Sequence, residues 1–252
     1  MEISLVPRFS SHSSVDRIAK GWRLEIPSGR SGTYRLAQLD DYARLPRAYF
    51  LHVPPVTITL TARASAVDLP GTWGFGFWND PLSFSLGLGR SAGRWPVLPN
   101  TTWFFHASHQ NWLSLRDGLP GNGFFAGTFQ SPRYPSWLLA LIAPAIPLMA
   151  FRPISRMIRK WAGRMITQDA ATVLVDVTEK HKYSLLWLRE SCLFKVDGET
   201  ILHTSTSPLP PLGLVLWIDN QFATWLQDGK LRFGTLDNPQ AWLEIEDLEI
   251  HT

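Results

Sequence analysis

The chain has 252 residues, 45% of them apolar, and contains 12 Trp, 14 Phe, 5 Tyr, 19 Pro and 18 Gly. Such a chain can bury a large core, and its spread of glycine and proline between short β-branched and aromatic runs favours a turn-rich β fold over a helical bundle or a doubly wound fold. The single cysteine, Cys192, excludes an intrachain disulfide and is expected to be a buried strand residue. The net charge of +3 comes from the basic residues between Asp117 and Asp169.

The N-terminal segment, "MEISLVPRFSSHSSVDRIAK", has neither a basic start before a long apolar stretch nor a cleavage-like end. It therefore does not have the pattern of a secretory signal. We expect a cytoplasmic location. The insertion described below indicates peripheral membrane contact as an alternative.

Short segments with the composition of strands follow one another along the chain, separated by turn signals such as Pro70-Gly71 and Asp228-Gly229. In "FKVDGETIL" the Asp197-Gly198 pair predicts a hairpin. With little helix between them, these segments predict two packed antiparallel sheets in a single domain, residues 1–252. The expected strands are 22–29, 33–39, 56–65, 72–79, 101–108, 122–129, 172–179, 183–190, 192–198, 200–206, 212–221 and 242–250.

The stretch "GTWGFGFWNDPLSF", residues 71–84, places two glycines between aromatic residues on one expected strand. Alternation sends Trp73, Phe75 and Phe77 to one face, and Gly74, Gly76 and Trp78 to the other. Glycine inside a strand often marks the close approach of a ligand. We therefore expect room for a ligand above the glycines, with Trp78 as a platform and Asp80 at the rim. The equal alternative is that a large residue from a neighbouring strand fills this space.

The same alternation groups Phe104 with His106 on one strand, and Trp217 with Asp219 on another, although it does not fix which face of each strand is concave. A carboxylic acid among aromatic walls would have a raised pKa and could donate a proton. The residues expected in one cleft are Asp80, Asp219, His106 and Glu190 as catalytic candidates, and Trp78, Gly74, Gly76, Phe104, Trp217 and Asn220 as ligand-binding candidates.

Residues 136–167 are expected to form an insertion, an apolar loop followed by an amphipathic basic helix. The uncharged run 137–151 is interrupted by prolines and is shorter than the ~20 residues that span a bilayer. Between Asp117 and Asp169 there are six basic residues and no acidic one. Outside this segment, the 21 acidic residues of the chain outnumber the basic ones, so the positive net charge comes from this segment. In the helix, Ile154, Met157, Ile158, Trp161 and Met165 recur at helical spacing, with Arg156, Arg159, Lys160 and Arg164 on the remaining arc.

This combination is typical of a helix that lies in the interface of an anionic membrane. The alternatives are that the helix covers one end of the sandwich, or that the apolar loop forms a homodimer contact. Nucleic acid is disfavoured, because no basic groove with interleaved aromatic residues occurs elsewhere. The expected membrane contacts are Trp137, Leu138, Ile142, Ile158, Trp161, Arg156, Arg159 and Lys160.

The stretch "YSLLWLRESCLFKVDGETILHTSTSPLPPLGLVLWIDN", residues 183–220, resembles the second half of concanavalin A-like lectin and glucanase domains, especially retaining β-glucanases of the laminarinase and lichenase type. "PGTWGFGFWNDP" is similar to a strand of their concave sheet. The resemblance implies a jelly-roll sandwich over residues 20–135 and 168–252. The elements that carry it match Tyr183–Trp187, Phe194–Gly198, Ile201–Thr204, Pro208–Pro211 and Leu214–Asn220.

The catalytic motif of those glucanases, Glu-x-Asp-x-x-Glu, supplies two carboxyl groups about 5 to 5.5 Å apart. The corresponding strand here, "TTWFFHASHQN", has no carboxylate, so the resemblance does not carry that chemistry over. "EIEDLE", with Glu244, Glu246 and Glu249, has a related spacing, but it lies in the last expected strand, which in this superfamily packs away from the cleft. There we expect a solvated acidic edge.

We expect no cofactor and no bound metal ion. The His106 and His109 rings would point to opposite faces of a strand, and no phosphate loop, paired-cysteine zinc motif or nucleophile elbow is present. Members of this superfamily often bind a structural calcium ion near the chain ends. Glu25 or Asp247 could bind such an ion here, but no feature of the sequence requires one.

Three functions fit this pattern. The first is an enzyme that cyclises or isomerises a lipophilic, isoprenoid-like substrate by acid/base catalysis, because aromatic walls stabilise developing positive charge. The second is a carbohydrate-active protein that binds or hydrolyses a glycan or glycolipid, with Trp78 and Trp103 as sugar platforms. The third is a non-catalytic binding module at a membrane surface. We favour the first, because the apolar insertion favours a lipophilic ligand.

Overall fold

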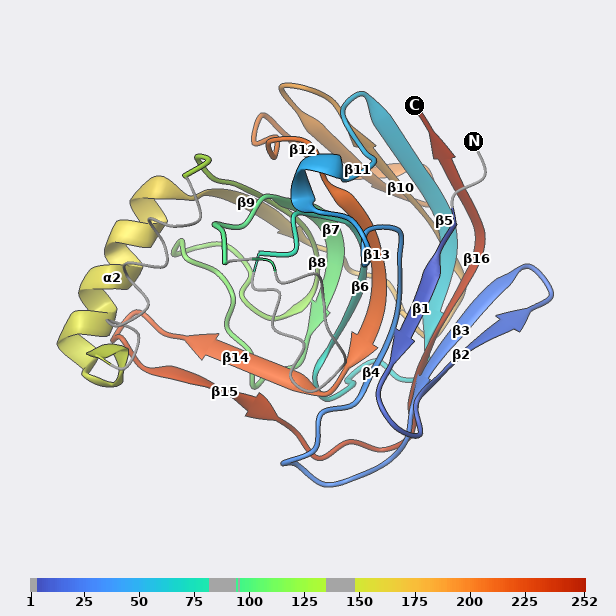
Figure 1. Cartoon of the computed structure of the whole chain (residues 1–252), viewed down its shortest axis with the longest axis horizontal. Coiled ribbons are helices and arrows are strands. Elements are labelled where there is room, and N and C mark those ends of the chain that lie inside the picture. The colour runs from blue at the N-terminus through green and yellow to red at the C-terminus, as the bar shows by residue number, and fades with distance from the viewer. Residues whose placement is uncertain (1–3, 82–93, 95, 135–147) are drawn as a thin grey trace.

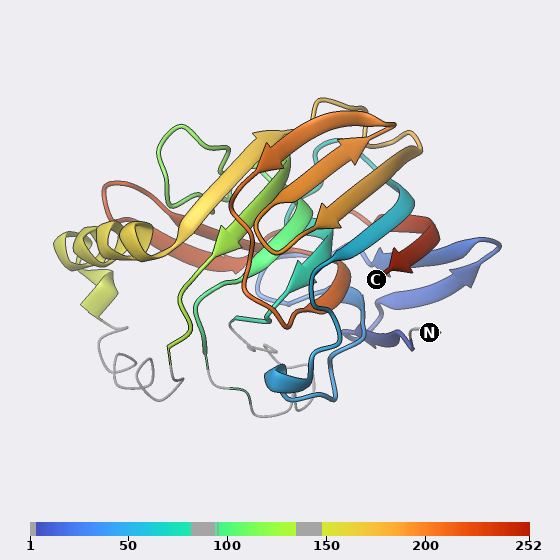
Figure 2. The ribbon, with the colours of Figure 1, turned by 90° about the horizontal axis from the view of Figure 1, so that it is seen from above.

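Two antiparallel β-sheets face each other in the computed structural model, which describes residues 4–81, 94, 96–134 and 148–252 (Figure 1). Figure 2 shows the two sheets as layers, with helix α2 (Arg152–Met165) beyond one end of them. The strands between Leu36 and His251 alternate in groups between the two layers. Half of the neighbouring strand pairs in these sheets therefore join strands that are not consecutive in the chain.

The described strands divide into two large sheets and one separate hairpin. Sheet A consists, in spatial order, of β1 (Val6–Phe9), β4 (Leu36–Asp40), β13 (Gly213–Asp219), β6 (Thr72–Trp78), β7 (Thr101–Ala107), β8 (Gly123–Gln130) and β9 (Thr167–Thr172). Sheet B consists of β12 (Glu199–Thr204), β11 (Cys192–Val196), β10 (His181–Trp187), β5 (Val56–Ala64), β16 (Ala241–His251), β3 (Gly21–Ile26) and β2 (Ser14–Ile18). The hairpin is β14 (Gln221–Trp225) with β15 (Leu231–Thr235), and the 3-10 turn η1 (Arg47–Tyr49) lies between β4 and β5.

The core lies between the two sheets. In β5 every second residue from Val56 to Ala64 is buried, as expected for a strand that turns one face to the core. From sheet A, the side chains of Trp73, Phe75 and Phe77 enter the same core and are each at most 1% exposed. The predicted two-sheet antiparallel jelly-roll sandwich is therefore confirmed, and Cys192 is a buried residue of β11 as expected.

The predicted hairpin at Asp197-Gly198 joins β11 to β12, and both turn residues have positive φ, +51° and +87°. These values suit the tight turn that Asp-Gly favours. The expected strand at 172–179 is wrong, because β9 ends at Thr172 and an irregular connection to β10 follows, in which Leu174 is 89% exposed.

The prediction of a solvated acidic edge at the C-terminus is wrong for the strand's position and for Glu244, whereas Glu249 is exposed as expected. Strand β16 lies inside sheet B, between β3 and β5. Glu244 is 7% exposed, and its carboxylate is paired with Arg23 at 3.3 Å and Arg63 at 2.7 Å. The acidic side chain is therefore held in a network with two arginines on the outer face of sheet B.

Helix α2 occupies the predicted helical part of the insertion, and its two buried residues, Ser155 and Arg159, are both polar. Arg159 is 6% exposed and donates from Nε to Trp225 O and from Nη2 to Ser114 O, both at 2.9 Å. Trp225 Nε1 in turn donates to Ser155 Oγ at 2.9 Å. The prediction that Arg159 is a membrane contact is therefore wrong, because its guanidinium is buried against backbone carbonyls.

The predicted contacts Trp137, Leu138 and Ile142 lie outside the described residues. In the part of the chain that is described, none of the helices has the length and apolar character needed to cross a bilayer.

Candidate functional site

The concave face of sheet A, defined as the face turned away from sheet B, carries a second apolar cluster. Figure 1 shows sheet A curving so that this face turns toward the side where α2 and the β14–β15 hairpin lie. The concave-face cluster consists of buried Leu36, Tyr42, Phe50, Phe105, Ala107, Phe125, Ala170, Val215 and Trp217, with partly buried Tyr34, Leu45, Trp78, Trp103 and Leu113 packed against them.

The ring of Trp217 fills the space above Gly74, and strand β7 approaches Gly76 closely at Trp103. In the register of the sheet, Trp217 on β13 is the partner of Gly74, and Trp103 on β7 is the partner of Gly76. A Cβ at position 74 would lie 2.7 Å from Trp217 Cη2, and one at position 76 would lie 2.7 Å from Trp103 Cβ. The expectation that these glycines leave room for a ligand is therefore corrected in favour of its alternative: they let large neighbours approach the backbone closely.

These neighbours form a layer of three indoles, which we call the tryptophan layer: Trp78, Trp103 and Trp217. The rings of Trp78 and Trp217 are stacked, with centroids 6.3 Å apart and an interplanar angle of 3°. Trp103 is tilted by 46° against Trp217 at 5.4 Å. Trp217 is only 7% exposed, whereas Trp78 and Trp103 are half-buried, so these two rings are the part of the layer that a ligand can reach.

Trp103 also carries an unused hydrogen-bond donor. Its Nε1 is buried and finds no acceptor among the residues that the structure describes. A buried indole N–H usually has a partner, since leaving it without one costs free energy. The edge of Trp103 is therefore suited to donate a hydrogen bond to a bound molecule.

Asp219 lies at one end of the concave face, at the last position of β13. Its carboxylate accepts hydrogen bonds from Thr72 Oγ1 at 2.8 Å and from the Gln221 N–H at 3.1 Å, and Tyr34 OH donates to it at 3.4 Å. Thr72 Oγ1 also accepts from Trp217 Nε1 at 3.0 Å, which links the acid to the tryptophan layer.

Burial raises the pKa of Asp219 to about 7, although the hydrogen bonds from Thr72, Gln221 and Tyr34 act in the opposite direction. Burial and the nearby Asp219 charge raise the pKa of Tyr34 well above its usual value, so Tyr34 remains a donor at neutral pH. Asp219 can therefore hold or release a proton near neutrality, which a general acid requires.

Asp80 has a different role at the opposite end of β6. It is 7% exposed, adopts a φ of +47°, and pairs through Oδ2 with Arg94 Nη1 at 2.6 Å. The Arg94 Nη2 group also donates to the carbonyl oxygens of Tyr42 and Leu45, at 2.6 and 2.7 Å. Asp80 and Arg94 therefore tie together the loops that follow β4 and β6.

The two predicted acids do not meet. Trp78 pairs with Gly213 and Thr72 pairs with Asp219, so Asp80 and Asp219 lie at opposite ends of this strand pair, about 20 Å or more apart at ~3.4 Å per residue. That separation exceeds the roughly 5–10 Å between the two carboxyl groups of glycosidases.

Phe104 and His106 face the inter-sheet core and are not part of the concave face. The Phe104 ring lies 5.1 Å from Tyr183 and 5.3 Å from Phe194, both residues of sheet B. His106 stacks on Trp73 at 5.3 Å, and burial lowers its pKa to about 4. The prediction that both line the cleft is corrected, because β7 turns Trp103 and Phe105 to the concave side instead.

Asn220 and Glu190 are also removed from the expected cleft. Asn220 is fully buried; its Nδ2 donates to Thr33 O and Leu236 O at 3.0 Å, and its Oδ1 accepts from the Arg35 N–H at 2.9 Å. These bonds occupy both donors, so Asn220 holds loops together. Glu190 lies exposed in the turn between β10 and β11 of sheet B.

A polar group on β1 and β4 completes the concave face and was not predicted. Asp40 accepts hydrogen bonds from Arg8 Nε at 2.6 Å and from Gln38 Nε2 at 2.8 Å. Gln38 Nε2 also donates to Tyr42 OH at 3.2 Å. Burial raises the pKa of Asp40, although the Arg8 guanidinium opposes this. Alternation of Leu36, Gln38 and Asp40 is the signal that could have indicated this group.

Among the described residues, no cluster of three or more His, Cys, Asp or Glu side chains is arranged to hold a metal ion.

Comparisons with known proteins give a likeness of fold. No family profile matches the sequence, and no curated protein matches it. Among solved structures, the chain is similar to a GH16 protein of the mixed-linkage glucan locus of Bacteroides ovatus, with a TM-score of 0.49, 10% identity, and coverage of 100% of this chain and 96% of that one. It is also similar to a legume lectin-like domain from Entamoeba histolytica, with a TM-score of 0.48, 8% identity, and coverage of 98% and 89%.

A third similar structure is the carbohydrate-binding module CBM66 from Bacillus subtilis, with a TM-score of 0.41, 7% identity, and coverage of 98% of this chain and 95% of that one. These neighbours are concanavalin A-like jelly rolls. At such identities and TM-scores the likeness concerns the fold alone.

The raised pKa of Asp219 predicts how stability depends on pH. Because the folded pKa, about 7, exceeds the ordinary value of 3.8, the folded state keeps a proton that the unfolded state loses, and stability falls as pH rises from 3.8 to 7. Chemical unfolding of the wild type should show a loss of about 3 kcal/mol between about pH 5 and about pH 8 from this group. In Asp219→Asn this component should vanish, and an equal fall in both proteins would contradict the assignment.

Proposed function

We propose that the protein binds a carbohydrate on the concave face of sheet A, with the tryptophan layer as its platform. The observation that carries this proposal is the pair of half-buried indoles, Trp78 and Trp103, together with the unpaired donor of Trp103. A sugar ring offers an apolar C–H face that can stack on an aromatic ring, and hydroxyl groups around its edge that accept hydrogen bonds.

Polar groups flank the tryptophan layer on two sides. At one end Asp219 and Tyr34 lie together, and on the β1–β4 side Arg8, Gln38 and Asp40 form the hydrogen-bonded group described above. Small ligands are usually oriented by a few polar groups around an apolar surface. This arrangement supports recognition of a molecule that combines apolar faces with many hydroxyl groups.

Recognition is favoured over glycoside hydrolysis. Asp40 pairs with Val215 and therefore lies about 14 Å along β13 from Asp219, at ~3.4 Å per residue. Both this separation and that between Asp80 and Asp219 are too large for the paired carboxyl groups of glycoside hydrolysis. Among the described acids of the concave face, Asp219 is thus left to bind hydroxyl groups without a catalytic partner.

Replacing Trp103 tests this proposal. Trp103→Phe keeps an aromatic ring in the layer but removes the Nε1 donor, so affinity for a bound oligosaccharide should fall about fivefold to tenfold. A panel of glucose-, mannose- and galactose-containing oligosaccharides, measured by calorimetry, identifies the ligand and gives the affinity. Trp242→Phe on the outer face of sheet B is the matched control and should bind like the wild type. Unchanged binding by Trp103→Phe would refute the proposed platform.

We also propose that α2 brings this sandwich to a membrane surface, so that the bound sugar is the head group of a glycolipid. The outward side of α2 and the residues just before it expose Phe151 (63%), Met157 (64%) and Trp161 (50%). Arg156 and Lys160 are exposed on the same helix. Exposed apolar side chains among cations match the apolar boundary and the negative charge of an anionic bilayer surface.

The exposed side chains of α2 can be changed without touching its polar anchor. The double variant Met157→Ser and Trp161→Ser should lose most of its co-flotation with vesicles of phosphatidylcholine and phosphatidylserine. Leu174→Ser, which also removes an exposed apolar side chain, is the control and should float like the wild type. Equal flotation of all three proteins, or none by the wild type, would refute the membrane contact.

A second candidate function is acid-catalysed isomerisation or cyclisation of a lipophilic substrate. The observation that favours it is a buried acid with a pKa of about 7 hydrogen-bonded to a layer of indoles. Protonated Asp219 would donate its proton to a double bond, the aromatic rings would stabilise the cation, and loss of a proton would give an isomer of the substrate.

Linear polyprenyl alcohols test the second candidate. The wild type should convert one of them into a product of unchanged mass, at a rate that falls above about pH 7 as Asp219 ionises. Asp219→Asn should give no product. Product formation by this variant, or a rate without that pH dependence, would exclude acid catalysis by Asp219.

A further inference from the structure

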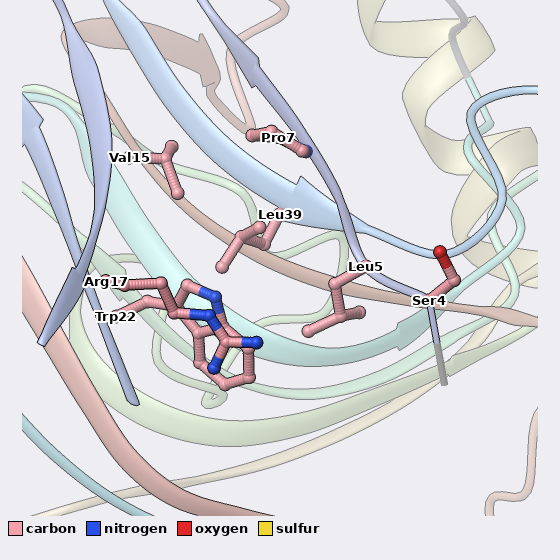
Figure 3. A pocket seen from close by; sticks show the side chains of 7 residues that line it. All are labelled: Ser4, Leu5, Pro7, Val15, Arg17, Trp22 and Leu39. Carbon is pink, nitrogen blue, oxygen red and sulfur yellow. The ribbon is translucent and has the colours of Figure 1, made fainter. Parts of the chain in front are cut away.

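The two sheets leave a hollow between them at one edge of the sandwich. Here β1 is the edge strand of sheet A and β2 is the edge strand of sheet B. The hollow has a volume of about 510 Å³, within the range of pockets that hold small ligands. Figure 3 shows the seven residues around it: Ser4, Leu5, Pro7, Val15, Arg17, Trp22 and Leu39.

Both sheets contribute apolar walls to this edge hollow. Leu39 of β4 is 2% exposed and belongs to the inter-sheet core. Leu5, Val15 and Trp22 are partly buried and pack against the same core. An apolar chain that entered here would extend the packing of the core and would remove partly exposed apolar surface from water.

The guanidinium group of Arg17 lies at this hollow. The guanidinium carbon of Arg17 lies 4.2 Å from the centroid of the Trp22 ring, and Figure 3 shows the two side chains superposed. Among the described residues no carboxylate pairs with Arg17, and the neighbouring Asp16 is engaged by Ser14 Oγ at 2.6 Å. A stacked guanidinium keeps the N–H groups along its edge available, and these suit a carboxylate in two-point contact.

We propose that the edge hollow binds a single-chain amphiphile with an anionic head, such as a long-chain fatty acid. Its hydrocarbon chain lies between the sheets against Leu39, Val15 and Leu5, and its carboxylate binds the Arg17 guanidinium. This site is separate from the concave face, because its walls belong to the inter-sheet side of sheet A and to sheet B.

A second protein strand fits this edge less well. Pro7 in the middle of β1 has no N–H to donate, and proline is a common means of preventing edge-to-edge pairing. The observations therefore favour a ligand that enters the hollow over a second copy that pairs with β1.

The test is a titration with a fluorescent polyene fatty acid, followed by displacement with palmitate and with its methyl ester. We expect saturable one-to-one binding that palmitate displaces about tenfold more effectively than the ester, because only the acid carries the charge. Arg17→Gln, an exposed position, should lower affinity for the acid by about the same factor and leave that for the ester unchanged.

Val15→Trp should abolish binding of both ligands by filling the hollow. Arg189→Gln, which removes an exposed cation in the β10–β11 turn, is the matched control and should bind like the wild type. Equal affinity of Arg17→Gln and the wild type for the acid would overturn the proposal, as would binding that requires a dimer in sedimentation. Oligosaccharide binding measured on Arg17→Gln should be unchanged, so the two proposed sites can fail independently.

Discussion

The packing of Trp103 and Trp217 onto the glycines of β6 determines the character of the concave face. A Cβ at position 74 would lie 2.7 Å from the Trp217 ring, and one at position 76 would lie 2.6 Å from Trp103 Cα, so β6 cannot carry larger residues at these positions without displacing the Trp217 ring or the neighbouring strand β7. Trp78 stacks on Trp217, and Trp103 lies 5.4 Å from Trp217, so the three indoles form one continuous layer. The glycines thus create the aromatic surface of the concave face and leave no empty space beneath it.

This constraint also decides what the acids of the concave face do. Trp217 links through Thr72 to Asp219, which is held away from water with a pKa near neutrality. Asp80 and Asp40 are each paired with an arginine, and both lie far along the strands from Asp219. The face therefore combines one carboxyl group that can hold a proton with aromatic platforms. This arrangement suits ligand binding better than glycoside hydrolysis, which needs two carboxyl groups close together.

The sequence could predict the alternation along β6, because a glycine face contrasts with an apolar one. It could also predict the Asp197-Gly198 hairpin, because this pair favours the positive φ values of a tight turn. It could not predict which side of β7 is concave. Phe104 and Phe105 are equally apolar, so a period of two identifies two faces without identifying the inner one. The polar contact of Arg159 was missed for a related reason, since hydropathy assigns the apolar arc of a helix to packing and cannot detect a guanidinium that binds backbone carbonyls.

The central claim is that a sugar lies on the outer surface of the tryptophan layer, and indole N–H resonances test it most directly. In a ¹H–¹⁵N spectrum, adding the tightest-binding oligosaccharide should shift the Nε1–H signal of Trp103 saturably. Trp73 is the internal control, because its Nε1 is also without a partner in the described chain but lies in the core between the sheets. A Trp103 signal that stays in place while the sugar binds would contradict the account.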